Sequence, residues 1–295
     1  MSRQQRPGNK HRSGHTLVEL LVALTIGLVI SLAVAALYSS TNASKQAFDD
    51  VTVLRDSARA ALQLMGEQIR TAGYGLLDPT GKNVFQGSAR TGQAAADTYG
   101  FPIFGCSTGF STDPPGTACA SSGNSPAFSV AYQAEAGSDL RDCEGNQGSD
   151  LGASGYVRTG FTAPADSKLV MSSFRLSGQQ LQCQGSGASW QVIVDNVVSF
   201  TVEYGVDTDN NTSGQPTDVA RSVNEWSAAG PSISADWANV VAVRLCIVLQ
   251  SAPGAGVSNT SYTNCSGANT NGADNRVYQR LTSTVQIRNI RPAVS

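Results

Sequence analysis

The feature that most constrains this chain is a long apolar run close to its N-terminus. The run extends from Leu20 to Leu37, and its only interruptions are the mild ones of Thr25, Gly27 and Ser31. A helix needs about 20 apolar residues to cross the hydrocarbon core of a bilayer, so the run predicts one membrane-spanning helix. Because basic residues precede the run, we expect the N-terminus to stay on the cytoplasmic side and the rest of the chain to lie outside.

The helix is expected to continue well beyond the membrane. No proline occurs between Pro7 and Pro79, and apolar residues recur at spacings of three and four after the apolar run. This spacing is typical of an amphipathic helix with one buried face. The face consists of Phe48, Val51, Leu54, Ala58, Leu62, Met65 and Ile69. We expect one helix from Thr16 to Ala72, ended by Gly73 and Gly75, whose amphipathic half packs against a sheet.

The rest of the chain is predicted to form loops first and strands later. Residues 76–125 are rich in Gly, Ser, Thr and Pro, which favours a loop-rich connection. Runs rich in β-branched and aromatic residues then predict strands; they are Ala127–Gln133, Leu169–Leu176, Gln180–Gln184, Trp190–Val206, Val240–Leu249 and Leu281–Ile290. The longest is expected to form one bent strand or two, and residues 207–217 and 251–275 are expected to be loops. A helix followed by a series of strands predicts an α+β fold with an antiparallel sheet.

The six cysteines are Cys106, Cys119, Cys143, Cys183, Cys246 and Cys265, all beyond the apolar run. None forms a C-x-x-C pair, so their spacing does not favour a zinc site or a redox motif. An even number of cysteines outside the membrane segment favours disulfide bonds formed in an oxidising compartment such as the periplasm. Six cysteines allow fifteen connectivities, and the sequence does not choose among them. Our hypothesis is the neighbour pairing 106–119, 143–183 and 246–265, with buried free thiols as the alternative.

Histidine content and net charge limit the functions that the rest of the chain can have. The only two histidines are His11 and His15, both close to the N-terminus. A Ser-His-Asp triad, a Cys-His pair and a His-bound metal are therefore excluded from the later part of the chain. No paired-acid motif stands out either, so we do not expect an enzyme. The formal net charge of the chain is −2. The net charge is more negative still when the basic residues before the apolar run are left out, so no nucleic-acid partner is expected.

Three interpretations of the N-terminal segment compete. The residues Ala33-Val34-Ala35 match the cleavage pattern of a secretory signal peptide. The segment is also consistent with an ordinary membrane anchor. Neither interpretation explains Glu19, because a carboxylate at the edge of an apolar helix is costly and needs a partner.

The third interpretation is a prepilin leader, and it gives Glu19 a use. A short basic stretch, Gly14 and a helix that begins HTLVELLVAL together resemble the N-terminal signal of type IV pilins. The resemblance implies that a prepilin peptidase cuts between Gly14 and His15 and methylates the new N-terminus. It also implies that Glu19 pairs with the N-terminal amine of a neighbouring subunit in the apolar core of the filament. The family usually has Phe where this chain has His15.

Three later segments resemble minor pilins of the PilW type, which are type IV pilus assembly proteins. They are VDNV at 194–197 leading to YGVDTD at 204–209, VAVRL at 241–245 and TSTVQIRN at 282–289. The resemblance implies a pilin-like α+β fold, in which a long N-terminal helix packs on an antiparallel β-sheet domain with long loops. The expected organisation is a leader at 1–14, a membrane-spanning or filament-core half-helix at 15–38, an amphipathic half-helix at 39–75 and a periplasmic β-rich domain at 76–295.

Asp207, Asp209 and Asn211 have the spacing of the first three ligands of a calcium-binding loop. However, Thr212 stands where such a loop needs Gly, and Asp218 stands where it usually has Glu. A polar turn between two strands explains the same residues. We therefore expect no cofactor, with calcium as the open alternative.

The resemblance implies a structural function, that of a minor pilin that helps to initiate or cap a type IV pilus, a fimbrium used in adhesion and twitching motility. Its expected partners are other minor pilins, the major pilin, the prepilin peptidase, the inner membrane and an adhesin at the tip. The expected location is the inner membrane, with a single span and a periplasmic domain, and then the cell-surface pilus. The alternative is a minor pseudopilin of a type II secretion system.

Overall fold

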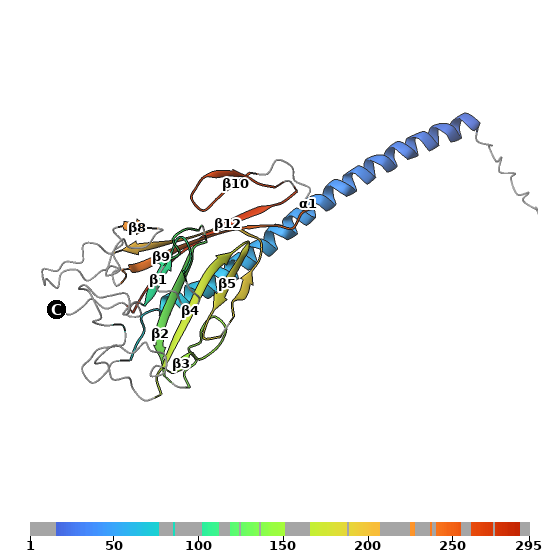
Figure 1. Ribbon diagram of the computed structural model, residues 1–295. Helices are drawn as coiled ribbons and strands as arrows, with labels where there is room; N and C mark the ends of the chain where they lie inside the picture. The colour runs from blue at the N-terminus through green and yellow to red at the C-terminus, as the bar shows by residue number, and fades with distance from the viewer. Residues whose placement is uncertain are drawn as a thin grey trace, which may run out of the picture. The chain divides into compact units, whose positions relative to one another are not determined.

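The computed structural model describes residues 16–76, 85, 102–111, 119–123, 125–135, 137–150, 166–187, 189–206, 225–227, 237, 240–254, 261–273 and 275–289. The chain divides into two compact units, Met1–Phe48 and Asp49–Ser295. One long helix, α1 (Leu17–Thr71), precedes all the strands (Figure 1). The strands are β1 (Ile103–Cys106), β2 (Ala127–Ala134), β3 (Ser149–Asp150), β4 (Lys168–Ser177), β5 (Gln180–Gln184), β6 (Gln191–Val194), β7 (Val197–Val206), β8 (Glu225–Ser227), β9 (Val240–Gln250), β10 (Ser261–Thr263), β11 (Asn269–Asn271) and β12 (Tyr278–Gln286).

The part of α1 in the second unit has one buried face. Its buried apolar side chains are Leu54, Ala58, Leu62, Met65 and Ile69, as the spacing predicts, together with Ala61, and Ala72 just after the helix is buried as well. The face begins later than expected, because Val51 is half-buried and Phe48 is 73% exposed. The helix ends at Thr71, and Gly73 follows with a φ of 77°, a left-handed conformation that glycine adopts without strain.

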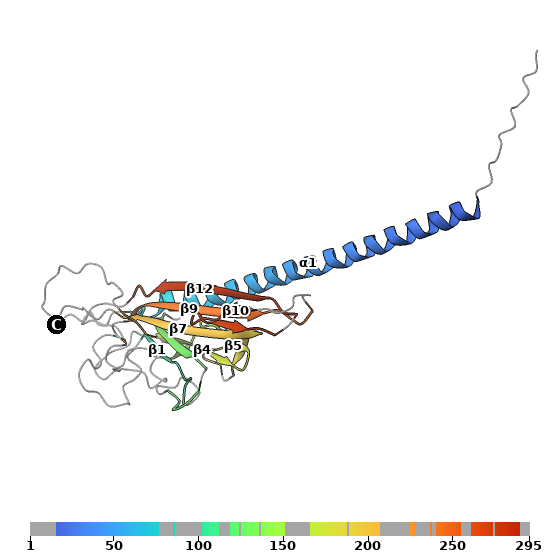
Figure 2. The same ribbon diagram turned by 90° about the horizontal axis from the view of Figure 1, so that it is seen from above.

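The strands form two main sheets and one small hairpin (Figures 1 and 2). The first sheet has the order β1-β2-β4-β5-β6, with β3 paired to β4. The second has the order β12-β9-β7-β8, and β10 pairs with β11. Every pair of neighbouring strands is antiparallel. The predicted α+β fold with antiparallel strands is confirmed, with two main sheets in place of the single one expected.

The run Trp190–Val206 forms two strands that belong to different sheets. The first, β6, ends at Val194 in the first sheet, and β7 begins at Val197 in the second. Between them Asn196 has a φ of 61°, a left-handed conformation that Asn tolerates better than most residues. Val197 N then donates to Gln179 O at 2.9 Å. The chain therefore passes from one sheet to the other at the Asp-Asn pair between β6 and β7.

One apolar core contains residues of α1 and of both main sheets. Along β9 the inward-facing side chains of Val243, Leu245, Ile247 and Leu249 are completely buried. At another place in the core, aromatic rings join the two sheets. The ring of Trp237 lies 4.8 Å from that of Tyr204 on β7 and 5.1 Å from that of Phe104 on β1, measured between ring centroids.

Two regions that were expected to be loops contain strands. The first is 76–125, which contains β1, and the second is 251–275, which contains β10 and β11. The latter two consist of the letters SYT and NTN, which carry little strand signal. Cys265, in the turn between them, is bonded to Cys246 of β9, and this bond holds the hairpin beside the second sheet.

Candidate functional site

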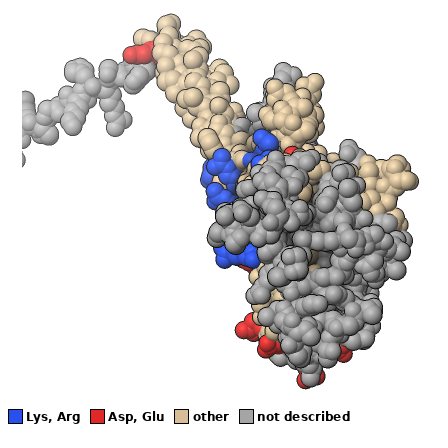
Figure 3. Space-filling model, turned by 90° about the vertical axis from the view of Figure 1, so that its left-hand side faces the viewer, with Lys and Arg blue, Asp and Glu red and all other residues tan. Residues whose placement is uncertain are grey.

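The first part of α1 presents a continuous apolar surface. The exposed fraction of its large aliphatic side chains ranges from 50% at Val22 to 78% at Leu17. Within the described residues, α1 is the one helix that is long and apolar enough to cross a membrane. Figure 3 shows that this stretch of the helix carries hardly any charge. An exposed apolar surface of this size indicates contact with lipid or with other proteins.

The hydroxyl groups that interrupt the apolar run are satisfied within the helix itself. Thr25 Oγ1 donates to Val22 O at 2.9 Å, and Ser31 Oγ donates to Gly27 O at 2.8 Å. Side-chain hydroxyls in helices often bond to a carbonyl one turn earlier in this way. These two residues therefore place no unpaired polar group on the apolar surface, which matters in lipid, where water is absent.

Thr16 starts the helix and Glu19 lies in its first turn. Glu19 N donates both to Thr16 O at 3.1 Å and to Thr16 Oγ1 at 3.3 Å, so Thr16 is the N-cap residue. The pattern Thr-x-x-Glu is that of a capping box, and a carboxylate in the first turn also interacts favourably with the helix dipole. Our sequence interpretation did not include this local role, although the pattern itself was sufficient to reveal it.

Among the described residues, the carboxylate of Glu19 has no charged partner. It is the only side chain between Thr16 and Tyr38 that is charged at neutral pH. Within the described part of the chain, the ion pairs are Lys168–Asp150 and Arg244–Glu203, and neither involves Glu19. An acidic group on an apolar surface is thus available for a partner outside this chain.

The C-terminal segment caps the C-terminal end of α1. Asn289 Nδ2 lies 3.2 Å from Arg70 O, 3.3 Å from Thr71 O and 3.5 Å from Ala72 O, which are among the last carbonyl groups of the helix end. Such carbonyls have no partner inside a helix and need an outside donor. The segment TSTVQIRN thus has a structural use, since its last residue caps the helix.

A buried glutamine joins α1 to the first sheet. Ser172 Oγ donates to Gln68 Oε1 at 2.8 Å and Tyr132 Oη donates to the same atom at 3.2 Å, while Gln68 Nε2 donates to Arg141 O at 3.1 Å. Tyr132 Oη also contacts Arg141 O. Burial raises the pKa of Tyr132 well above its ordinary value, so its hydroxyl stays protonated and continues to donate. These bonds fix the rotation of the helix on the sheet.

A buried carboxylate joins two loops beside this network. Asp142 Oδ1 accepts from Glu144 N at 2.9 Å and from Asn146 N at 2.8 Å. Asp142 Oδ2 accepts from the backbone and side chain of Ser186, each at 2.7 Å. The adjacent disulfide bond Cys143–Cys183 connects the first of these loops to β5. Sequence reasoning missed Asp142, because Ser186, which lies 44 residues away in the sequence, becomes its neighbour only in the fold.

The structure brings some of the predicted residues together and does not describe others. The disulfide bonds are Cys106–Cys119, Cys143–Cys183 and Cys246–Cys265, which is the neighbour pairing of our hypothesis. Gly14 and His15 lie outside the described residues, and so do Asp207, Asp209 and Asn211. Cleavage after Gly14 and calcium binding at 207–211 therefore stay predictions. In the described part of the chain, no group of three His, Cys, Asp or Glu residues is arranged to hold a metal.

Two family models match parts of this chain. Residues 9–35 match the family model described as the prokaryotic N-terminal methylation motif. Residues 156–289 match the model described as Type IV Pilus-assembly protein W, a match that starts upstream of the segments quoted above and ends at the capping residue Asn289. No curated protein matches the chain.

Among solved structures, a type IV-like pilin from Thermus thermophilus is similar over 81% of this chain and 97% of that chain, with 13% identity and a TM-score of 0.44. At that level of similarity, the fold assignment depends on the helix and the sheets of this chain. The methylation motif and the apolar helix define the class of the protein, which is type IV pilin-like. Within that class, residues 156–289 are similar to the type IV pilus assembly protein W family.

Proposed function

We propose that this chain is a minor pilin that takes part in assembly of a type IV pilus, in an initiating or tip complex with other minor pilins. The observation that supports this proposal most directly is the exposed apolar helix with a single carboxylate in its first turn, that of Glu19, which has no ion-pair partner among the described residues. A plain membrane anchor gains only the local capping role from Glu19, and a polar uncharged residue would fill that role without a charge that is costly in lipid. A subunit that moves from lipid into a filament needs an apolar surface and one specific ionic contact.

The proposed mechanism uses the same helix surface twice. In the inner membrane, the aliphatic side chains of Leu17–Tyr38 contact lipid. In the filament they pack against the helices of other subunits, and Thr25 and Ser31 do not oppose this because their hydroxyls are bonded internally. Glu19 then pairs with the N-terminal amine that cleavage between Gly14 and His15 creates on a neighbouring subunit. Removing one member of a buried ion pair costs about 3–5 kcal/mol, so the pair selects the correct register of helices.

The same proposal places the disulfide-bonded domain in the periplasm and later on the cell surface. Basic residues before the apolar helix favour a cytoplasmic N-terminus. Three disulfide bonds suit an oxidising compartment. We propose that the prepilin peptidase processes the chain, that its partners are pilins, and that it supports adhesion and twitching motility without catalysing a reaction itself.

Substitution of Glu19 tests the proposed function. Glu19→Leu should be produced, inserted and folded normally, because the residue lies far in sequence from the strands and because the change removes a charge that is costly in lipid. It should nevertheless enter pili poorly, since a neighbour's amine loses its partner. The measurement is the abundance of the subunit in sheared pili divided by its abundance in membranes.

The matched control is Asp56→Leu, which removes an exposed acid from α1 outside the apolar stretch. This variant should enter pili as well as the unmodified chain does. If Glu19→Leu enters pili equally well, Glu19 has no pairing function in assembly and only caps its own helix.

A minor pseudopilin of a type II secretion system remains the second candidate, because its apolar helix would have the same design. The match of residues 156–289 to the pilus assembly family favours the pilus. Deletion of the gene separates the two functions. The pilin proposal predicts loss of surface pili and of twitching with protein secretion intact, and the pseudopilin alternative predicts the reverse.

A further inference from the structure

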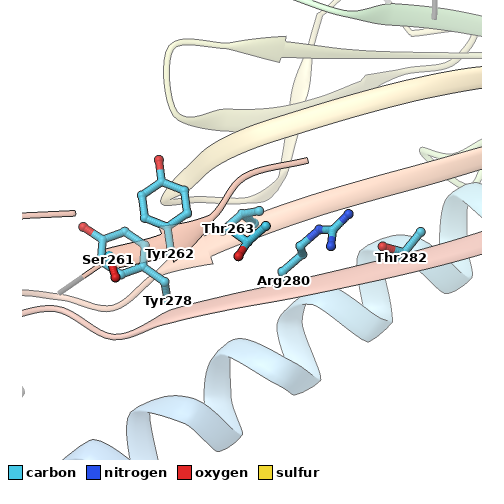
Figure 4. A pocket seen from close by; sticks show the side chains of 7 residues that line it. Ser261, Tyr262, Thr263, Tyr278, Arg280 and Thr282 are labelled. Carbon is cyan, nitrogen blue, oxygen red and sulfur yellow. The ribbon is translucent and has the colours of Figure 1, made fainter. Parts of the chain in front are cut away.

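A hollow lies between the hairpin β10–β11 and the outer face of the second sheet (Figure 4). Its volume is about 410 Å³, and strands β9, β10 and β12 contribute its lining. The disulfide bond Cys246–Cys265 ties the hairpin to β9, and Cys265 N donates to Ser199 Oγ of β7 at 3.2 Å. These bonds fix the hairpin, and with it the shape of the hollow. The size of the hollow is within the range of about 300–1,000 Å³ usual for small-molecule sites.

Two stacked tyrosines form one end of the hollow. The rings of Tyr262 on β10 and Tyr278 on β12 are parallel within 10°, with their centroids 4.4 Å apart. Tyr278 is fixed from behind, because Ala273 N donates to its hydroxyl at 2.7 Å and because its ring packs against Gly272, where a side chain would collide with it. The pair is thus a rigid aromatic surface. Burial, and then the neighbouring Tyr278, raise the pKa of Tyr262, so its hydroxyl remains a neutral donor.

Most of the remaining lining residues have hydrogen-bonding groups with no partner among the described residues. Within the described part of the chain, no hydrogen bond or ion pair occupies the side chains of Ser261, Tyr262, Arg280 or Thr282. Figure 4 shows Arg280 and Thr282 along β12 and the tyrosines at one end. These groups lie on one side of β12, since Arg280 pairs with Val248 and Thr282 with Cys246 on the outer face of β9.

Another arginine on the same face of the sheet, Arg244, has partners for its guanidinium group and serves as a comparison for Arg280. Arg244 forms an ion pair with Glu203 at 3.1 Å, and its guanidinium carbon lies 4.0 Å from the ring centroid of Trp226. Arg280 has neither an acidic nor an aromatic partner of this kind within the described residues. Among the described residues, Arg244 has partners within the fold, whereas Arg280 has none and lies beside a polar hollow.

The geometry points to a binding site for a carboxylated saccharide of one or two rings. A guanidinium binds a carboxylate in a bidentate manner, which gives Arg280 the role of holding the acidic group. Hydroxyls that both donate and accept match the hydroxyls of a sugar ring, which gives Ser261, Tyr262 and Thr282 that role. The flat apolar surface of the tyrosine pair suits the C–H face of such a ring. A single cation and a short hollow do not suit a nucleic acid, which needs an extended basic surface.

The test uses the full-length chain in detergent micelles and isothermal titration calorimetry. The acidic probe is the hyaluronan disaccharide, which contains glucuronic acid, and the neutral probe is chitobiose. We expect saturable binding of the acidic disaccharide and at least about 10-fold weaker binding of chitobiose, because a lost bidentate contact is worth a factor of this size. Arg280→Gln should weaken binding of the acidic probe to the level of the neutral one.

Arg288→Gln is the matched control, because Arg288 is an exposed arginine just beyond the end of β12. It should leave the affinity unchanged. A second variant, Thr282→Val, replaces an exposed side chain of the lining by one of the same shape, and it should weaken both probes equally. The proposal is overturned if the acidic disaccharide does not bind saturably, if Arg288→Gln weakens it as much as Arg280→Gln does, or if inorganic phosphate displaces it at equal concentration, which would indicate a simple anion site.

Discussion

Two buried tyrosines show how the value of a single hydroxyl group depends on its partners. Tyr132 Oη donates to Gln68 Oε1 at 3.2 Å, whereas Tyr204 Oη has no partner among the described residues. Gly105 lies so close to the Tyr204 hydroxyl that a side chain there would collide with it. One hydroxyl therefore joins α1 to the sheet, and the other is buried without a hydrogen bond to any described residue.

The two tyrosines should respond in opposite directions to the same substitution. Tyr132→Phe should lower the free energy of unfolding by about 1 kcal/mol, because a hydrogen bond is lost. Tyr204→Phe should leave it unchanged or raise it by up to about 1 kcal/mol, because an unsatisfied buried hydroxyl is removed. Urea titration of both variants measures this difference. Equal losses would show that Tyr204 finds a partner that this account lacks.

The same residues give a pH dependence whose sign follows from burial. Burial raises the pKa of Tyr132 and of Tyr204 from the ordinary value of 10.0. Below pH 10 both tyrosines are protonated in the folded and the unfolded states, so their contribution to the free energy of unfolding does not depend on pH. Above pH 10 the unfolded chain releases these protons and the folded chain does not, so stability falls. In Tyr204→Phe the fall between pH 10 and 11 should be smaller than in the unmodified protein.

Single residues also show where sequence reasoning reached its limit. The importance of Glu19 follows from the sequence, because a charge in an apolar run is conspicuous and Thr16 lies three residues before it. Gln68 and Asp142 carry no such signal. Gln68 meets Ser172, and Asp142 meets Ser186, only because the fold brings distant segments together.

At the scale of elements, periodic segments were predictable and the joints between them were not. The helix α1 and the strands β2, β4, β5 and β9 lie where their apolar patterns predict, since such patterns are local. The transfer of the chain between sheets at Asn196 depends on hydrogen bonds to distant strands. The hairpin β10–β11 depends on a disulfide bond to β9. Neither can be inferred from the letters of the segment itself.

The closure of α1 by the C-terminal segment gives a prediction at this scale. Asn289→Ala should lower the free energy of unfolding by about 1 kcal/mol, because the last helical carbonyls lose their donor. Hydrogen exchange should also become faster in the last turn of the helix. Arg288→Ala, at the exposed neighbouring residue, is the control and should change neither quantity. An unchanged stability in Asn289→Ala would mean that other donors replace the amide.

At the scale of the whole molecule, the chain combines two surfaces with opposite requirements. The first part of α1 exposes apolar side chains that only lipid or other helices can cover. The second unit buries its apolar side chains in its own core and is tied by three disulfide bonds. This division is what a subunit needs if it is first held in a membrane and then built into a filament through its helix.

The central claim is that the chain is processed as a prepilin, and mass spectrometry of its N-terminus tests this most directly. The protein is extracted from membranes of cells that contain the prepilin peptidase and from cells that lack it. We predict a mature chain that begins with N-methylated His15 in the first case, and a chain that still carries the leader in the second. A chain that begins at Ala36, or an unprocessed chain in both cells, would contradict the account.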